Sequence, residues 1–312
     1  MKILIFANSS LFVKTVTGIL DHIQVVGIII PDTSNNDLLS TVEYAEAQQI
    51  PLLKVSAADL KKGREVNSWI LATGCNAALV MTFPFKIPES ILNIPEKGVF
   101  NVHYSMLPAY KGPDPVFWQL KNGLKEIGLS IHKMTDILDE GPLVFRKAMV
   151  LMPGENYGLA AVRLTLLLSQ NLDEIFQNIL AEKYIAAESE IQTSYFKRPQ
   201  VDDLTINWEQ QSAVEIENLV NAANPRYNGA VSYLNEQPVR ILEVSGVDGK
   251  FEPGTVVPGT VFHIDPHHGP MVLTADKQLL LFNIVETENG IFSGKKWCAM
   301  GLKRGDRFVS LN

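Results

Sequence analysis

Cysteine is scarce in this sequence of 312 residues. Only Cys75 and Cys298 are present, and neither has a second Cys or a His nearby at zinc-ligand spacing. We therefore expect no disulfide framework and no metal site. Long apolar runs are missing too, since no stretch approaches the roughly 20 residues of a membrane helix. Residues 1–6 lead directly into a strand-like segment, so we expect no signal peptide. We also expect a cytoplasmic location and no contact with a membrane.

Positive charge is also in short supply. The chain has 27 Lys and Arg against 34 Asp and Glu, a formal net charge of -7. This balance disfavours a strongly basic nucleic-acid binder. Hydrophobic residues make up 46% of the chain, which is enough for a real core and excludes wholesale disorder. The length suggests two domains.

Glycine is absent where a dinucleotide-binding protein needs it. The first strand-like run is followed by Ala7-Asn8-Ser9-Ser10, whereas a dinucleotide-binding turn carries G-x-G-x-x-G so that the backbone can approach a pyrophosphate. No GxxxxGK[ST] phosphate loop occurs either. NAD- or FAD-dependent chemistry is therefore disfavoured.

What the first half does contain is an alternation of short apolar runs and helical periods. The pattern predicts strands at 2–6, 25–30, 52–55, 77–82, 99–103, 129–134 and 143–152, and helices at 11–20, 38–48, 57–72 and 157–183. Strands that alternate with helices indicate right-handed crossovers and a mostly parallel sheet. We predict a doubly wound α/β domain.

The pattern changes after Asn224-Pro225. A helix at 213–223 is followed by short strands at 231–234, 239–244, 260–264, 271–275 and 279–285, separated by turn residues about every ten positions. This spacing is typical of a small β-barrel. We predict three parts: an N-terminal domain at 1–183, a linker at 184–205 and a C-terminal barrel domain at 206–312.

The stretch 100–114 carries the chemistry. Ligands of open α/β sheets bind beyond the carboxyl ends of the strands, and alternation puts Asn101 and His103 on one side of a strand at that end. An amide and an imidazole suit oxyanion stabilisation and proton movement. Asp139, in a turn before Gly141, can face the same edge. Taken singly, each has an ordinary structural interpretation, a hydrogen-bonded His and an Asp-x-Gly turn.

Together, these residues resemble a known family. N-x-H-x-S-x-L-P-x-Y-x-G at 101–112, G-L-S-I-H-x-M at 128–134 and D-x-G at 139–141 are similar to the motifs of enzymes that transfer a formyl group from 10-formyltetrahydrofolate. Met106 and Ser130 stand where Leu and Thr are usual. The likeness continues through Ile206-Asn207-Trp208 to Gly305-Asp306. It implies a formyltransferase-like Rossmann variant followed by an OB-like β-barrel, as in methionyl-tRNA formyltransferase.

The resemblance implies a catalytic trio of Asn101, His103 and Asp139. Asn101 and protonated His103 would donate to the oxyanion that forms when an amine attacks the formyl carbon. Asp139 would hold His103 and pass on the proton of the amine. The co-substrate would be 10-formyltetrahydrofolate, and no metal is needed.

The resemblance also implies binding residues. Those expected to hold the folate are Met81, Thr82, Phe83, Pro84, Phe85, Ile87, Thr135, Asp136 and Leu138. Those expected to hold the amine-bearing substrate are Ser105, Tyr110, Lys111, Gly112, Asp114 and Arg198. For Phe83 and Phe85, core packing is the alternative interpretation. For Arg198, the alternative is an ion pair with Asp202 or Asp203 within the linker.

The amine that accepts the formyl group is harder to predict than the donor. A methionyl-tRNA formyltransferase usually has a basic insertion after the second strand, but 31–38 contains no Lys or Arg. Residues 206–312 hold 9 Lys and Arg against 12 Asp and Glu, whereas a tRNA is a polyanion. Lys111–Trp118 and the R-P-x-x-D element at Arg198 look like the branch that acts on nucleotide-linked amino sugars. We therefore favour a nucleotide sugar as partner over tRNA, with other amines behind both.

Two other functions keep the same fold. A formyltetrahydrofolate hydrolase would use the trio with water in place of the amine, and a binding module would need no intact trio. The barrel could serve as the surface of a homodimer.

Overall fold

The computed structural model describes residues 1–17, 23–33, 36–186, 192–249, 251–252 and 254–310. Parts of three predicted segments lie outside these residues: 18–20 of the helix expected at 11–20, 34–35 of the non-basic stretch 31–38, and 187–191 of the expected linker.

The first sheet has seven strands in the order β3-β2-β1-β4-β5-β6-β7. The strands are β1 (Lys2–Ala7), β2 (Gln24–Pro31), β3 (Leu52–Val55), β4 (Ala77–Met81), β5 (Gly98–His103), β6 (Glu126–Lys133) and β7 (Leu143–Val150). All neighbours from β3 to β5 pair in parallel, and β6 pairs antiparallel to β5. The associated helices are α1 (Ser10–Thr17), α2 (Asn36–Ala47), α3 (Ala57–Lys62), α4 (Arg64–Thr73), α5 (Glu89–Leu92) and α7 (Tyr157–Leu180).

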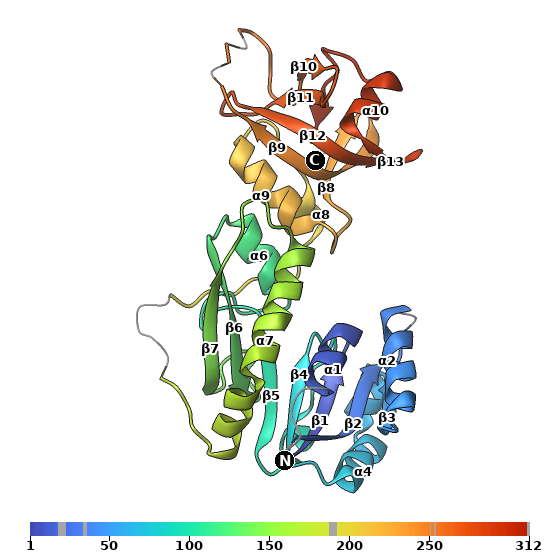
Figure 1. The fold of residues 1–312 in the computed structure, drawn as a ribbon, viewed down its shortest axis with the longest axis vertical. Coiled ribbons are helices and arrows are strands. Elements are labelled where there is room, and N and C mark those ends of the chain that lie inside the picture. Colours follow the sequence, from blue (N-terminus) through green and yellow to red (C-terminus); the bar gives the residue numbers. More distant parts are fainter. Residues whose placement is uncertain (18–22, 34–35, 187–191, 250, 253, 311–312) are drawn as a thin grey trace. The chain divides into compact units, whose positions relative to one another are not determined.

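The central strands are hydrophobic throughout because both faces are covered. Every residue of β4 is buried, and so is every residue of β1 after Lys2. Figure 1 shows α1, α2 and α4 beside β1, β2 and β3. The predicted mostly parallel α/β sheet is confirmed.

The helix predicted at 57–72 is two helices. Gly63 ends α3 and begins α4 with a φ of 73°, in a region that L side chains rarely adopt. Ser56 caps α3 through a capping box with Asp59. The apolar periodicity continued across the break and hid it.

The second sheet is antiparallel, with the order β10-β11-β12-β9-β8-β14 and β13 paired to β12. The strands are β8 (Ala230–Leu234), β9 (Gln237–Val247), β10 (Val261–Asp265), β11 (Gly269–Leu273), β12 (Leu279–Thr287), β13 (Gly290–Ser293) and β14 (Phe308–Val309). Its helices are α8 (Val201–Leu204), α9 (Ala213–Ala223) and α10 (Gly294–Ala299). It curls into a half-barrel around Trp208, Phe282 and Phe308, which confirms the expected barrel-type domain.

The chain forms two compact units that are interleaved in sequence. Unit 1 comprises 1–112, 127–149 and 162–195, and unit 2 comprises 113–126, 150–161 and 196–312. Helix α6 (Pro115–Lys121) belongs to unit 2, where it packs on α9. Within the described residues, no helix has the length and apolar character needed to cross a membrane.

Candidate active site

Two members of the predicted trio lie at the carboxyl end of β5, in unit 1. Pairing with β6 sets Asn101 opposite His132 and His103 opposite Ser130. Because β5 is flanked by β4 on one side and β6 on the other, its backbone is fixed from both sides. Asn101 and His103 therefore project from a rigid strand toward the edge where ligands of such sheets bind.

His103 is buried between two acceptors. Its Nε2–H donates to the carbonyl oxygen of Tyr110 at 2.9 Å, and its Nδ1 lies 3.7 Å from Asp139 Oδ1. Burial lowers the pKa of His103, and it outweighs the carboxylate of Asp139, which acts to raise it. The imidazole is therefore neutral at rest, which differs from the protonated form that the resemblance implied, and it lies beside a carboxylate that stabilises it once it is protonated.

Asp139 reaches the same place from the loop after β6. Its backbone adopts a φ of 56°, and its Oδ2 accepts a hydrogen bond from the backbone N–H of Gly112 at 2.9 Å. Burial acts to raise the pKa of Asp139, but His132, His103 and the Gly112 N–H together lower it to about 2. The group is thus an ionised carboxylate across the physiological range.

His132 is a fourth polar group at this site. Its Nε2 lies 3.3 Å from Asn101 Nδ2 and 3.5 Å from Asp139 Oδ1, and the side chain is almost fully buried. It therefore links the amide of Asn101 to the carboxylate. In the sequence, His132 is part of the motif at 128–134, and no separate role could be predicted for it. The sequence places His132 in a predicted strand that follows the strand of Asn101 and His103. Only the pairing register of β5 and β6 shows that His132 lies opposite Asn101.

The segments expected to hold the folate are divided between core and surface. Met81 and Ile87 are buried, and Phe83 packs edge-on against Phe6 and Phe85, so core packing accounts for Phe83. Thr82 and Pro84 are exposed on the loop after β4.

The second such segment is the exposed loop that precedes Asp139. Thr135 Oγ1 donates to the carbonyl oxygen of Ile137 at 3.1 Å, which makes a local turn. Asp136 is exposed, and Ile137 and Leu138 are each 55% exposed. Two large apolar side chains thus face water next to the carboxylate of Asp139.

Four of the residues expected to hold the acceptor lie in the loop after β5. Ser105 is fully buried, and its hydroxyl donates to the Ala109 carbonyl oxygen at 2.7 Å, so it braces the loop. Tyr110, at a φ of 57°, presents its carbonyl oxygen to His103. Lys111 Nζ donates to Glu140 at 2.7 Å, and Gly112 holds Asp139 through its N–H. Three of the four therefore contact a member of the trio or the loop that carries Asp139.

Asp114 and Arg198 belong to unit 2. Asp114 is buried and accepts a short hydrogen bond from the hydroxyl of Tyr227, with Arg226 Nε at 3.9 Å. Arg198 is exposed, and among the described residues it forms no ion pair with Asp202 or Asp203. Asp203 pairs instead with Lys121 at 3.4 Å.

The site thus combines an amide, a buried imidazole and an ionised carboxylate at the carboxyl end of a parallel strand. This combination suits an enzyme that transfers a group. Such a site can stabilise an oxyanion and take up a proton while a group moves from one carrier to another. The chain belongs to the formyl transferase family: the model of the formyl transferase domain matches residues 1–165, and that of the formyl transferase C-terminal domain matches residues 200–300.

Curated relatives are similar over two thirds of this chain or nearly all of it. A methionyl-tRNA formyltransferase of Synechococcus elongatus is 28% identical over 325 residues, covering 97% of both chains. One from Coprothermobacter proteolyticus is 29% identical over 215 residues, covering 68% of both chains. The prediction of a formyltransferase is confirmed at the level of the family.

Solved structures share the fold at low identity. WlaRD, a sugar 3N-formyl transferase crystallised with dTDP and 5-N-formyl-THF, has a TM-score of 0.63 at 15% identity and covers 90% of this chain and 96% of its own. An N-formyltransferase from Helicobacter canadensis, in complex with folinic acid and dTDP-3-aminofucose, has a TM-score of 0.59 at 16% identity, covering 90% and 98%. HypX from Aquifex aeolicus in complex with tetrahydrofolic acid has a TM-score of 0.61 at 12% identity, covering 97% and 48%.

Proposed function

We propose that this protein transfers the formyl group of 10-formyltetrahydrofolate to the primary amine of a nucleotide-activated amino sugar. The observation that carries the proposal is the pairing of buried His103 with Asp139, which His132 joins to the amide of Asn101 at one end of β5. The folate compounds bound by WlaRD, the Helicobacter canadensis enzyme and HypX support the donor.

In the proposed reaction, the amine nitrogen attacks the formyl carbon and the carbonyl electron pair moves onto oxygen. The Nδ2 group of Asn101 donates a hydrogen bond to this oxyanion. Because the amide is held by His132, it needs little reorganisation as charge develops on the oxygen.

The proton of the attacking amine goes to His103. The imidazole is neutral at rest because burial lowers its pKa, so it can accept the proton. Once charged, it is stabilised by the Asp139 carboxylate 3.7 Å away. The oxyanion then re-forms the carbonyl, the bond from the formyl carbon to N10 of the folate breaks, and N10 takes up the proton that His103 accepted, which returns the imidazole to its neutral form. The products are a formamide and tetrahydrofolate.

The exposed apolar residues before Asp139 support a pteridine site. Ile137 and Leu138 expose more than half of their surface beside the trio, and a flat heterocycle would cover such side chains. Thr82 and Pro84, exposed on the loop after β4, would form the opposite wall.

The charge of the chain supports the small acceptor. Within 206–312, acidic residues outnumber basic ones, and 31–38 holds no cation. A tRNA acceptor arm needs several cations for its phosphates. A cytoplasmic location, the three-part division at 183 and 205 and the homodimer stay predictions from the sequence.

Initiator methionyl-tRNA is the second candidate acceptor. The similarity of this chain to the Synechococcus elongatus methionyl-tRNA formyltransferase over 97% of both chains favours it. A salt titration separates the two. Binding through several phosphates should weaken by orders of magnitude between about 50 and 200 mM salt, whereas a nucleotide sugar should respond weakly.

The experiment is a formyl-transfer assay with 10-formyltetrahydrofolate and either methionyl-tRNA or a panel of nucleotide-linked amino sugars, each at several salt concentrations. We expect turnover with an amino sugar that changes little with salt. If only methionyl-tRNA is formylated, the acceptor is the tRNA and not an amino sugar. The assignment of 10-formyltetrahydrofolate as the donor would still hold. Formate release at the full rate without any amine would indicate a hydrolase.

A further inference from the structure

A segment that is distant in the sequence lies along the loop after β5. Ser194 Oγ accepts a hydrogen bond from the backbone N–H of Tyr110 at 2.9 Å, and the Ser194 carbonyl oxygen accepts one from the N–H of Lys111 at 2.9 Å. The N–H of Ser194 donates to the carbonyl oxygen of Pro108 at 3.4 Å, and Lys111 and Tyr195 form a parallel β-bridge. All of these residues belong to unit 1. Ser194 therefore holds this loop from 84 positions away in the sequence.

Tyr110 needs such support because of its backbone conformation. Its φ is 57°, in the left-handed region that residues with a Cβ rarely adopt. The peptide units on either side of its Cα are both bonded to Ser194, one through the Tyr110 N–H and the other through the Lys111 N–H. Contacts with a single residue therefore hold Tyr110 in this conformation.

The second of these peptide units also contacts the imidazole. A trans peptide is planar, and its N–H and C=O point in opposite directions. The unit between Tyr110 and Lys111 thus directs its N–H to the Ser194 carbonyl oxygen and its C=O to His103 Nε2, at 2.9 Å each. A hydrogen bond at one end of a peptide strengthens the bond at the other end. Ser194 and His103 are thereby connected through one rigid group.

The Tyr110 carbonyl oxygen decides which ring nitrogen of His103 carries the proton. A carbonyl oxygen can only accept, so the neutral ring carries its proton on Nε2 when this bond is formed. The lone pair is then on Nδ1, which lies 3.7 Å from Asp139 Oδ1. If the carbonyl oxygen turned away, the neutral ring would place its proton on Nδ1, where the carboxylate would accept a hydrogen bond from it. The basic nitrogen would then be Nε2, and a proton taken up there would not lie beside Asp139.

We propose that Ser194 is a positioning residue of the formyl transfer, because it holds the Tyr110 carbonyl oxygen on His103 Nε2 and so keeps the lone pair on Nδ1. The inference rests on the proposed function, in which His103 accepts the proton of the attacking amine. Loss of the Ser194 hydroxyl releases the N–H of Tyr110. The loop can then turn to a negative φ, which takes the carbonyl oxygen away from the ring.

The test combines steady-state kinetics with the nitrogen NMR spectrum of the His103 ring, in which a protonated and an unprotonated nitrogen have different chemical shifts. The variants are Ser194→Ala, which removes the acceptor for the Tyr110 N–H, and Ser194→Thr, which keeps a hydroxyl there. Ser68→Ala is the matched control, since Ser68 lies on α4 of the same unit and its hydroxyl donates to the carbonyl oxygen of Arg64 at 2.9 Å.

We expect the wild type, Ser194→Thr and Ser68→Ala to carry the proton on Nε2, and Ser194→Ala to carry it largely on Nδ1. In Ser194→Ala, kcat should fall about tenfold, while the affinity for 5-formyltetrahydrofolate stays within about twofold of the wild type because no residue expected to hold the folate is altered. Ser194→Thr and Ser68→Ala should keep kcat within about threefold of the wild type.

A proton on Nδ1 in the wild type would overturn the inference before any variant is made. A Ser194→Ala protein that keeps the Nε2 proton, or that keeps the kcat of the wild type, would also overturn it, since a general loosening of the loop lowers kcat without changing the tautomer. The spectrum needs no substrate, so it separates this inference from the proposed function. If the tautomer changes as expected but His103→Ala transfers formyl groups at the wild-type rate, the proposed role of His103 fails and only the positioning of its ring stands.

Discussion

At the scale of single residues, His103 has an unusual pair of neighbours. One ring nitrogen faces the carbonyl oxygen of Tyr110 and the other faces the carboxylate of Asp139, and both neighbours accept hydrogen bonds. Only a doubly protonated ring satisfies both, yet burial lowers the pKa of His103. In the proposed mechanism, the second ring proton comes from the attacking amine during the reaction.

A pH dependence follows from this pKa. Since the base must be neutral, kcat/KM should fall on the acid side with an apparent pKa below 6.5, the ordinary value for histidine. Asp139 raises the pKa of His103, so Asp139→Asn should move the titration of His103 to lower pH. An NMR titration of the imidazole measures this directly. A midpoint above 7, or an upward shift in the variant, would contradict the assignment of His103 as the base.

His132 gives a prediction that separates its two ring nitrogens. Its Nε2 faces Asn101 and Asp139, and a glutamine amide can reach the position of Nε2, whereas an asparagine amide reaches only that of Nδ1. We expect His132→Asn to lower kcat by about 100-fold and His132→Gln by about tenfold, because a displaced Asn101 or Asp139 costs alignment. Steady-state kinetics with folate KM as the control checks this. Equal losses in the two variants would mean that Nε2 has no positioning role.

The residues differ in how far the sequence could predict their place. Asn101 and His103 follow from strand alternation, and Asp139 followed from a turn motif together with the family resemblance. His132 required the register of β5 against β6, which sequence alternation does not give. The burial of Ser105 could be known only from the packing of its loop. In the sequence, a serine before a Leu-Pro turn can equally well contact a ligand or stabilise the loop.

At the scale of elements, the loop from β6 to β7 depends on one close approach. A Cβ on Gly141 would lie 1.6 Å from the carbonyl oxygen of Lys133, a backbone atom that cannot move aside. Only glycine lets the loop return this close to β6 and carry Asp139 back to the end of β5. The D-x-G motif thus reflects packing as well as turn chemistry.

Gly141→Ala should therefore displace Asp139 and lower kcat/KM at least tenfold, with a loss of stability of about 1–3 kcal/mol from overpacking. Gly246→Ala is the matched control, because a Cβ there meets nothing within 4 Å. Thermal unfolding and activity of both variants check this. A Gly141→Ala protein with the activity of the control would refute the role of the close approach.

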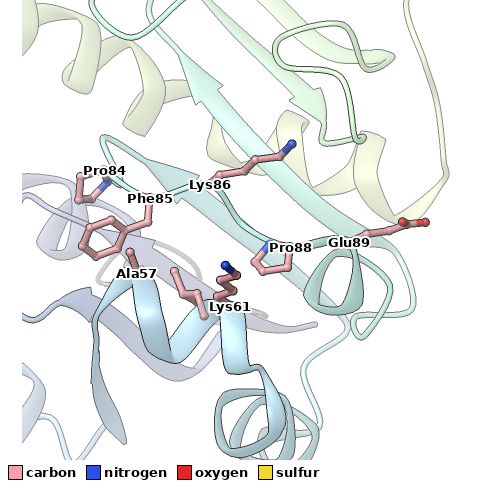
Figure 2. A pocket seen from close by; sticks show the side chains of 8 residues that line it. Ala57, Lys61, Pro84, Phe85, Lys86, Pro88 and Glu89 are labelled. Atoms are coloured by element: carbon pink, nitrogen blue, oxygen red, sulfur yellow. The ribbon is translucent and has the colours of Figure 1, made fainter.

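Some elements could not be predicted because their signals are local. The short helices α5, α6 and α10 are too brief for a periodic pattern to stand out. The break at Gly63 leaves α3 as a separate element that, together with the segment after β4, lines a pocket (Figure 2).

At the scale of the whole molecule, the two fold types could be predicted, but the division of the chain between the compact units could not. Residues 113–126 and 150–161 belong to unit 2 through contacts with distant sequence. Trp118 stacks on Phe196 and donates to the carbonyl oxygen of Lys197 at 2.9 Å, and Asp114 is bonded to Tyr227. No periodicity within 113–126 indicates these partners.

The most direct test is the turnover of 10-formyltetrahydrofolate with an amine acceptor by the wild type, Asn101→Ala, His103→Ala and Asp139→Asn, with the affinity for 5-formyltetrahydrofolate measured alongside. Asn93→Ala, an exposed asparagine of the same unit, is the control. We predict that each trio variant loses about 10²- to 10⁴-fold in kcat while its affinity for the folate stays within about threefold of the wild type. A trio variant that turns over at the wild-type rate would contradict the account.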